Sequence, residues 1–189
     1  LEPLKPRKLA YMLQKIDLAD RSSSSNEYYP DPIIKNELDT SSGIFYMSRP
    51  LERAISVNGF LTAMLSASIN KKDMDIGMTF YEVTSSGKYF QLSYVLQRAS
   101  YAADMARRKL LEPGVKVQLP VERSRMVSKM LEKGSRLLVV LNIDKNPFAQ
   151  VNYGTGKEVS SETISDAGEP LLVKWFNESY IQVPVSFEH

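Results

Sequence analysis

Apolar residues in this chain come in short runs separated by turn residues, and the most continuous run lies at residues 137–141. Leucine and valine fill all of its positions, and a turn at Gly134 precedes it. A short apolar run of this kind is typical of a β-strand with both faces covered. The run leads into a polar loop that ends with the sequence NYGTG at residues 152–156. We therefore predict a rigid strand that supports a specific loop.

The same succession of strand and turn recurs along most of the chain. Apolar and polar residues alternate at 73–83 and again at 115–121, as they do on a half-buried strand. Further strands are predicted at 44–47, 54–65, 89–95, 171–175 and 180–185. Because strands dominate and no βαβ alternation is visible, the predicted fold class is mainly β, an antiparallel β-sandwich of the jelly-roll type with short helical segments.

The pattern leaves alternatives open at 54–65 and 126–131, and it predicts helix at 102–111. Residues 54–65 fit either a strand pair or one kinked strand around Asn58-Gly59. Residues 102–111 favour a helical turn, and residues 126–131 favour a short helix or an extended segment. At the level of domains, we assign residues 1–43 to a connector and N-terminal extension, and residues 44–189 to the sandwich.

Composition places the chain among ordinary globular proteins. Its 189 residues are 43% hydrophobic and 24% charged, enough for a sizeable core in one domain. It has no cysteine, which excludes a disulfide framework and a thiolate metal site. No apolar run approaches the roughly 20 residues of a membrane-spanning helix, so we expect no membrane partner. The cellular compartment stays open.

Charge is distributed unevenly along the chain. The net charge of +2 is too small to indicate a nucleic-acid partner. Residues 98–136 contain ten Lys or Arg against four Asp or Glu, whereas residues 144–189 contain three against seven. We expect two differently charged solvated faces. The alternative is a basic surface that meets an acidic partner domain.

Two carboxylates at the start of a predicted strand are the first candidate site. Asp73 and Asp75 are two residues apart, so on one strand they share a face. We expect them to pair with Arg98 or Arg49 at the rim of the sheet, because a half-buried Asp needs a partner. The alternative is a cation or acid–base site, but calcium takes 6–8 oxygens and two carboxylates are too few. We expect no metal and no cofactor.

Polar residues around the strand at 137–141 are a second candidate. They are Asn142, Asp144, Asn146 and Asn152. Such side chains usually bond to nearby backbone in turns. The alternative is a polar rim that contacts a partner domain. The basic stretch at 107–109 is expected to be a solvated turn rather than a phosphate site.

Aromatic residues near the end of the chain are a third candidate. They are Tyr153, Trp175, Phe176 and Tyr180. Aromatic residues favour strands and cores, which is the simpler explanation. The alternatives are a platform for a sugar and a patch between domains.

Five short motifs occur in a fixed order. They are residues 73–77 with 81–83 and Gly87, residues 97–101, residues 111–114, residues 133–137, and Asn146-Pro147 with Asn152 and residues 154–156. The ordered set, over residues 44–185, resembles the C-terminal non-catalytic domain of the X-Pro dipeptidyl-peptidase and cocaine-esterase-like (CocE/NonD) serine hydrolases. The resemblance implies a galactose-binding-like jelly roll that packs on an α/β-hydrolase catalytic domain of the same parent chain.

Catalytic residues of such a hydrolase are missing from this sequence. It has no G-x-S-x-G motif, and its one histidine is the terminal His189. We therefore expect no enzyme activity from this chain alone, and a serine hydrolase of dipeptidyl-peptidase, esterase or acylase type as the parent. The domain would shape substrate access, and a homo-oligomer formed through the parent stays open. A carbohydrate-binding module is the alternative function, and a stand-alone enzyme is disfavoured because acid–base groups are lacking.

Overall fold

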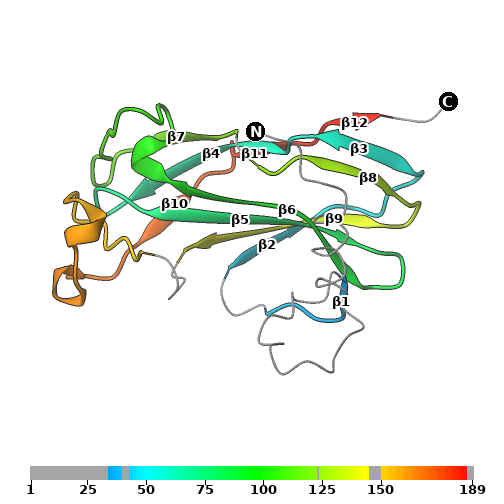
Figure 1. The fold of residues 1–189 in the computed structure, drawn as a ribbon, viewed down its shortest axis with the longest axis horizontal. Coiled ribbons are helices and arrows are strands. Elements are labelled where there is room, and N and C mark those ends of the chain that lie inside the picture. The colour runs from blue at the N-terminus through cyan, green and yellow to red at the C-terminus, as the bar shows by residue number, and fades with distance from the viewer. Residues whose placement is uncertain (1–33, 40–42, 123, 145–149, 187–189) are drawn as a thin grey trace, which may run out of the picture. The chain divides into compact units, whose positions relative to one another are not determined.

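Strands dominate the chain, and every pairing between them is antiparallel. The computed structural model describes residues 34–39, 43–122, 124–144 and 150–186, which lie in one unit that begins at Ile34. The strands form two layers, as Figure 1 shows. The predicted fold class, a mainly antiparallel β-sandwich, is confirmed.

The first layer is a five-stranded sheet with the order β1-β6-β5-β9-β2. Its strands are β1 (Ile34–Lys35), β2 (Ile44–Met47), β5 (Asp75–Val83), β6 (Tyr89–Arg98) and β9 (Arg136–Ile143). The central strand β5 pairs with β6 on one side and with β9 on the other. Strand β1 lies inside the range 1–43 that the sequence analysis assigned to a connector, and that domain division stays a prediction.

The second layer consists of two smaller sheets. One has the order β10-β4-β11 with β7 on the other edge of β4, and the other has the order β12-β3-β8. Their strands are β3 (Ile55–Gly59), β4 (Thr62–Ile69), β7 (Val117–Val121), β8 (Val127–Leu131), β10 (Val173–Trp175), β11 (Tyr180–Gln182) and β12 (Val185–Ser186). In Figure 1, β3, β7, β8 and β12 run above the five-stranded sheet.

Of the two alternatives predicted for residues 54–65, a strand pair and one kinked strand, the strand pair was wrong. Strands β3 and β4 follow each other in sequence but belong to different sheets, so they do not pair with each other. The break between them lies at Leu61, which is only 1% exposed. Its N–H donates to the hydroxyl of Ser124 at 2.8 Å, and this bond turns the chain from one sheet into the next.

Helical structure in the described residues is limited to three single 3-10 turns. They are η1 (Ala99–Tyr101), η2 (Val159–Ser161) and η3 (Ile164–Asp166). The helical turn predicted at 102–111 is absent, because η1 ends before it and the following residues form only turns and bends. Residues 126–131 are extended and contain β8. No helix in this part of the chain is long and apolar enough to cross a membrane.

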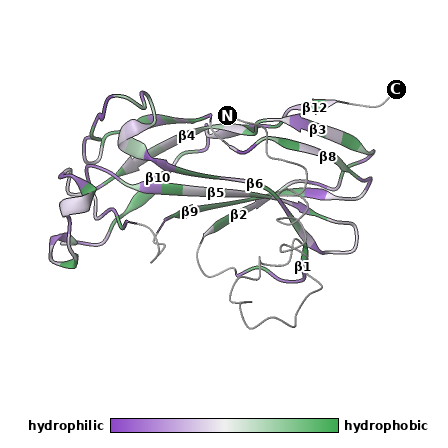
Figure 2. Ribbon diagram, in the orientation of Figure 1, coloured by the Kyte–Doolittle hydropathy of each residue, from purple (hydrophilic) through white to green (hydrophobic). Residues whose placement is uncertain are grey.

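The main core lies between the two layers. Its largest fully buried side chains include Phe80, Met74 and Leu119. Each such burial is worth about 1.5–3 kcal/mol relative to exposure. Figure 2 shows hydrophobic residues along β9 and parts of β5, the two strands that contribute Phe80, Val139 and Leu141 to this core.

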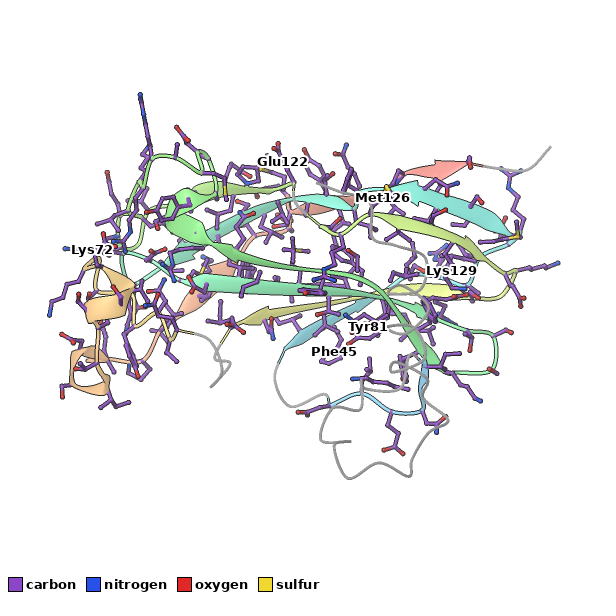
Figure 3. The ribbon with its side chains drawn as sticks, in the orientation of Figure 1. Phe45, Lys72, Tyr81, Glu122, Met126 and Lys129 are labelled. Atoms are coloured by element: carbon purple, nitrogen blue, oxygen red, sulfur yellow. The ribbon has the colours of Figure 1, made fainter. Side chains whose placement is uncertain are left out.

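Strand β9 has both faces covered, as its continuous apolar run predicted. Val139 and Leu141 point into the main core, whereas Leu138 belongs to a second cluster with Tyr81 on the opposite face. Phe45 packs against this second cluster, and Figure 3 shows it beside Tyr81 on the outer side of the sheet. Since side chains alternate along a strand, two covered faces require the near-continuous apolar sequence.

Candidate functional site

Among the described residues, Asp73 is the most deeply buried carboxylate, and it lies just before β5. It is 1% exposed. Its Oδ1 accepts hydrogen bonds from the N–H groups of Met74 and Ser100, at 2.9 and 3.0 Å. Its Oδ2 accepts the hydroxyl of Ser100 at 2.6 Å and a guanidinium nitrogen of Arg108 at 3.2 Å. Four donors therefore occupy both oxygens of this side chain.

Asp75 is the first residue of β5 and has a separate set of partners. Arg98, opposite it in the β5–β6 ladder, donates from Nε at 2.8 Å and from a terminal nitrogen at 3.0 Å. The side-chain amide of Asn152 donates to the same Oδ1 at 2.9 Å. The hydrogen bond to Asp75 raises the pKa of Arg98 above its ordinary value, although burial acts in the opposite direction.

The expectation that the two carboxylates lie together on one strand needs correction. Asp73 precedes β5, whose first residue is Asp75. Asp73 pairs with Arg108 and Asp75 pairs with Arg98, whereas Arg49, the alternative partner, forms no ion pair with either within the described residues. Within the described ranges, no three His, Cys, Asp or Glu side chains gather closely enough to hold a metal ion.

Arg108 was expected in a solvated basic turn, and this was wrong. Its side chain is only 15% exposed and reaches Asp73, with Glu158 as a second, exposed partner at 3.3 Å. Its neighbours Arg107 and Lys109 are exposed. In this basic stretch, Arg108 therefore has a structural role, whereas Arg107 and Lys109 are solvated. The sequence alone does not distinguish the three residues.

The NYGTG loop is fixed against the chain that enters β5. Asn152 bonds to Asp75, and the carbonyl of Gly154 accepts the N–H of Lys72 at 3.0 Å. The ammonium group of Lys71 donates to the carbonyl of Tyr153 at 2.9 Å. Gly154 has a φ of +76°, a backbone conformation that favours glycine.

Glu162 holds the same loop from its other side. Its carboxylate accepts the N–H of Tyr153 at 2.8 Å and the N–H of Thr155 at 2.9 Å, together with the Thr155 hydroxyl. Sequence reasoning missed Glu162. A glutamate a few residues after a glycine-containing turn was the only available signal, and it is a weak one.

The remaining predicted site residues lie apart from this network. Asn146 lies outside the described residues. Trp175 is in β10, opposite Ala67 of β4, and packs partly buried against the main core. Asn142 lies over Gly77, where an added Cβ would come within 2.1 Å of its side-chain oxygen. The structure thus joins Asp73, Asp75, Arg98, Asn152 and Tyr153 in one region and leaves Trp175 elsewhere.

Trp175 instead lines a cleft of 480 Å³ between the two layers. The cleft opens between β2 and β9 of the five-stranded sheet and β4, β10 and β11 of the second layer. Its lining residues are Tyr46, Leu65, Met78, Val139, Leu141, Trp175, Phe176, Asn177, Ser179, Tyr180 and Ile181. Most of them are apolar, so the cleft presents an aromatic and aliphatic wall rather than a set of catalytic groups.

Two lysines lie over the ring of Phe176, which is one of the residues that line this cleft. The ammonium groups of Lys116 and Lys174 lie 4.7 and 5.2 Å from the centre of its ring. Lys116 also forms an ion pair with Glu178, which accepts the Ser66 hydroxyl at 2.9 Å. The hydrogen bond from Lys116, more than that from Ser66, lowers the pKa of Glu178 below its ordinary value.

Known proteins share both the sequence pattern and the fold. The family model of the X-Pro dipeptidyl-peptidase C-terminal non-catalytic domain matches residues 7–172. An aminopeptidase from the marine sediment archaeon Thaumarchaeota archaeon superposes with a TM-score of 0.73 and 18% identity, over 82% of this chain and 28% of that chain. No curated protein matches the sequence.

Two hydrolases give further structural matches. An α-amino acid ester hydrolase has a TM-score of 0.71 and 17% identity, over 78% of this chain and 26% of that chain. A CocE/NonD family hydrolase from Staphylococcus aureus has a TM-score of 0.56 and 14% identity, over 81% of this chain and 32% of that chain. The chain therefore spans about a third or less of the length of these structures, and at these identities the likeness shows the fold alone.

Proposed function

Because this chain belongs to the family of X-Pro dipeptidyl-peptidase C-terminal non-catalytic domains, we propose that it serves as the accessory domain of a serine hydrolase. The parent enzyme would be of X-Pro dipeptidyl-peptidase, esterase or acylase type. The domain packs on an α/β-hydrolase catalytic domain of the same parent chain. There it shapes the entrance through which substrate reaches the active site.

The observation that carries this proposal is that the buried carboxylates are bonded to internal partners. The described buried acids are Asp73, Asp75 and Glu82. Asp73 and Asp75 bind arginines, and Glu82 accepts the Ser135 hydroxyl at 2.8 Å with Lys129 at 3.2 Å. A general acid or base must reach a substrate proton, whereas these oxygens are held by internal donors. Carboxylates whose oxygens already accept internal hydrogen bonds suit a rigid scaffold better than a catalytic site.

Rigidity is the property that an accessory domain of this kind needs. A group that restricts a substrate entrance acts through its position, so its own supports must be fixed by packing and hydrogen bonds. The loop at 152–162 meets this requirement, because Asn152, Lys71 and Glu162 fix it from both sides. A loop that is fixed in this way would keep its shape beside a catalytic domain, and this supports the proposal.

Enzyme assays of the 189-residue chain and of the full parent protein test this function. Each is offered a chromogenic ester and an X-Pro amide at equal molar concentration. We expect turnover by the parent alone, and the preferred substrate then identifies the enzyme type. Turnover by the 189-residue chain would overturn the accessory role, as would a parent without a hydrolase domain.

The carbohydrate-binding alternative stays a prediction. Among its candidate aromatics, Trp175 is partly buried and Phe176 has lysines near its ring, whereas Tyr180 is 52% exposed. A stacking platform needs an open ring face, which favours Tyr180 over the others. Binding to a glycan panel that is lost in Tyr180→Ala would support the alternative.

A further inference from the structure

The second layer is interrupted along the edge that borders the cleft. Strands β10 and β11 both pair with β4, but their pairing stops at Ala67 and at Met64. Residues 176–179 therefore run beside only two residues of β4, Leu65 and Ser66, which have no strand partner on this edge in the described chain. Leu65 lines the cleft at this gap. Irregular strand edges of this kind are common next to functional sites.

Hydrogen bonds hold the interruption in one shape. The N–H of Ser66 donates to the hydroxyl of Ser179 at 2.9 Å, and the carbonyl of Ser66 accepts the N–H of Phe176 at 2.9 Å. The Ser179 hydroxyl in turn donates to the carbonyl of Phe176 at 2.8 Å. The Ser66 hydroxyl donates to Glu178 at 2.9 Å, and Glu178 also pairs with Lys116. The gap is thus fixed by the protein itself, and a pre-formed cavity is typical of a ligand site.

The cleft combines an apolar interior with exposed aromatic rings. Leu65, Met78 and Leu141 line it and are at most 5% exposed. Tyr46 of β2 lines it from the five-stranded sheet and is 50% exposed, and Tyr180 of β11 lines it from the second layer and is 52% exposed. An apolar body could therefore be buried between the layers while one end of it stays near water.

Hydrogen-bonding groups are available in the cleft, whereas charges are not. Within the described residues, the side chains of Tyr46, Trp175, Asn177 and Tyr180 line the cleft and have no hydrogen-bond partner in the protein. None of the eleven described lining residues is charged. An ion in this cleft would lose its water without gaining a counter-charge from the wall. The lining therefore favours an uncharged ligand.

The size of the cleft suits a small molecule. Its volume of 480 Å³ lies within the range of about 300–1,000 Å³ that is typical of small-molecule sites. An apolar cavity of roughly 150 Å³ holds one benzene, so this cleft has room for two or three rings. Its eleven lining residues are fewer than the roughly 20–30 residues on each side of a stable protein interface. A protein partner would gain too little contact here.

We propose that this cleft binds a small, uncharged, apolar molecule of two or three rings that carries a single hydrogen-bonding group such as an alcohol or an amide. The rings lie against Leu65, Met78 and Leu141, and the polar group is directed toward the hydroxyls of Tyr46 and Tyr180. A sugar fits poorly, because most of its hydroxyls would face apolar side chains. The inference does not rest on the accessory function, which the enzyme assays test separately.

An NMR titration with naphthalenemethanol, two fused rings with one alcohol, tests the site. Trp175 is the only tryptophan of the chain and lines the cleft, so its indole N–H gives a single signal that reports on this place. We expect the signal to shift saturably, with one ligand per chain and a submillimolar dissociation constant. A Trp175 signal that does not shift at the solubility limit of the ligand would overturn the inference.

Matched substitutions of half-exposed tyrosines locate the ligand. Tyr46→Ala and Tyr180→Ala each remove a ring from the cleft, whereas Tyr94→Ala removes a 41% exposed ring of β6 that does not line it. We expect the first two variants to bind at least about fivefold more weakly and the third to stay within about twofold. Unchanged amide signals of β5 verify that each variant is folded. Equal affinities in the three variants would overturn the inference.

Two further ligands test the chemical class. Naphthoate has the same rings with a carboxylate in place of the alcohol, and we expect it to bind at least about fivefold more weakly. Equal or tighter binding of naphthoate would overturn the assignment to an uncharged ligand. Galactose that shifts the Trp175 signal at a lower concentration than naphthalenemethanol would likewise overturn the assignment to an apolar one.

The full parent protein and the free chain give the remaining results. We expect saturation-transfer NMR to detect naphthalenemethanol on the parent and to lose most of this signal in its Tyr180→Ala variant. Binding to the 189-residue chain but not to the parent would overturn the inference, because another part of the parent would then cover the cleft. A Trp175 signal that moves with the concentration of the ligand-free chain would assign the cleft to a second copy, with the same consequence.

Discussion

Single buried charges determine the polar geometry of this domain. Asp73 and Asp75 are nearly inaccessible to water, and each is matched by one arginine and by neutral donors. Removing a carboxylate from water is costly, so such pairs add little net stability over an apolar contact. Breaking one of them is a different matter, because the partner cation is left without its acceptor. The pairs thus select one arrangement of the loops around β5.

Asp75→Ala should destabilise the domain by about 2–3 kcal/mol, because it removes the acceptor of both Arg98 and Asn152. The value lies below that of a fully buried pair, since the Arg98 side chain is 26% exposed. Urea unfolding measures the change. Glu158→Ala is the control, because it removes a 76% exposed partner of Arg108 and should cost less than about 1 kcal/mol. Equal losses in the two variants would contradict a structural role for Asp75.

Asp166 should titrate far below an ordinary aspartate. The hydrogen bond from Lys157, followed by those from the N–H and hydroxyl of Thr163, lowers its pKa from 3.8 to about 2. A lowered pKa stabilises the folded state above pH 3.8, and this contribution is lost as the pH falls through about 2. Carboxyl-carbon NMR of the folded chain should give this midpoint. Lys157→Ala should raise it toward 3.8, and an unchanged midpoint would refute the assigned cause.

The loop between Asn152 and Glu162 shows how a glycine fixes an element. Gly154 combines a φ of +76° with a close approach to the chain that enters β5. An added Cβ there would lie 2.7 Å from the carbonyl oxygen of Asp73 and 3.0 Å from the side chain of Lys71. Because the added Cβ would clash with the backbone of Asp73, the loop could not adjust without moving the chain that carries the buried carboxylates.

Gly154→Ala should therefore cost about 2–4 kcal/mol, the sum of left-handed backbone strain and a steric clash. Gly87→Ala separates the two terms, because Gly87 has a φ of +80° and no atom within 4 Å of the added Cβ. That variant should cost only about 1–2 kcal/mol. Thermal unfolding of both variants measures the difference. A loss at Gly154 no greater than at Gly87 would show that the loop moves away freely.

At the scale of the whole molecule, we expect the stability of each strand against local opening to depend on its position in the sandwich. Strand β5 has a neighbour on each side, and most of its residues are buried. Strand β12 is a two-residue edge strand with exposed side chains. Opening β5 requires disruption of both ladders and of the main core, whereas β12 can open alone.

Native-state hydrogen exchange should follow this order. We expect the amides of β5 to exchange at least about 100-fold more slowly than those of β12, because they open only with the global unfolding of the domain. Mass spectrometry of peptides that cover the two strands measures the rates. Comparable rates would mean that the two layers separate in one step without local opening.

The strand pattern, the fold class and the family were predictable because they depend on residues that are close in sequence. A period of two predicts a strand, and the continuous run at 137–141 predicted correctly that both faces of β9 are covered. All five motifs lie within the family match at residues 7–172. The fold itself is shared with structures of only 14–18% identity.

Only the tertiary structure decided which strands and side chains meet. The sequence did not show that β3 and β4 enter different sheets, nor that Arg108 would be half-buried while its neighbours stay exposed. These outcomes depend on contacts between distant residues, such as Asn152 with Asp75 across 77 positions. The cleft likewise combines strands from both layers. The sequence by itself determined the elements and their family, and packing between distant segments determined the site, because burial and pairing exist only once the layers are assembled.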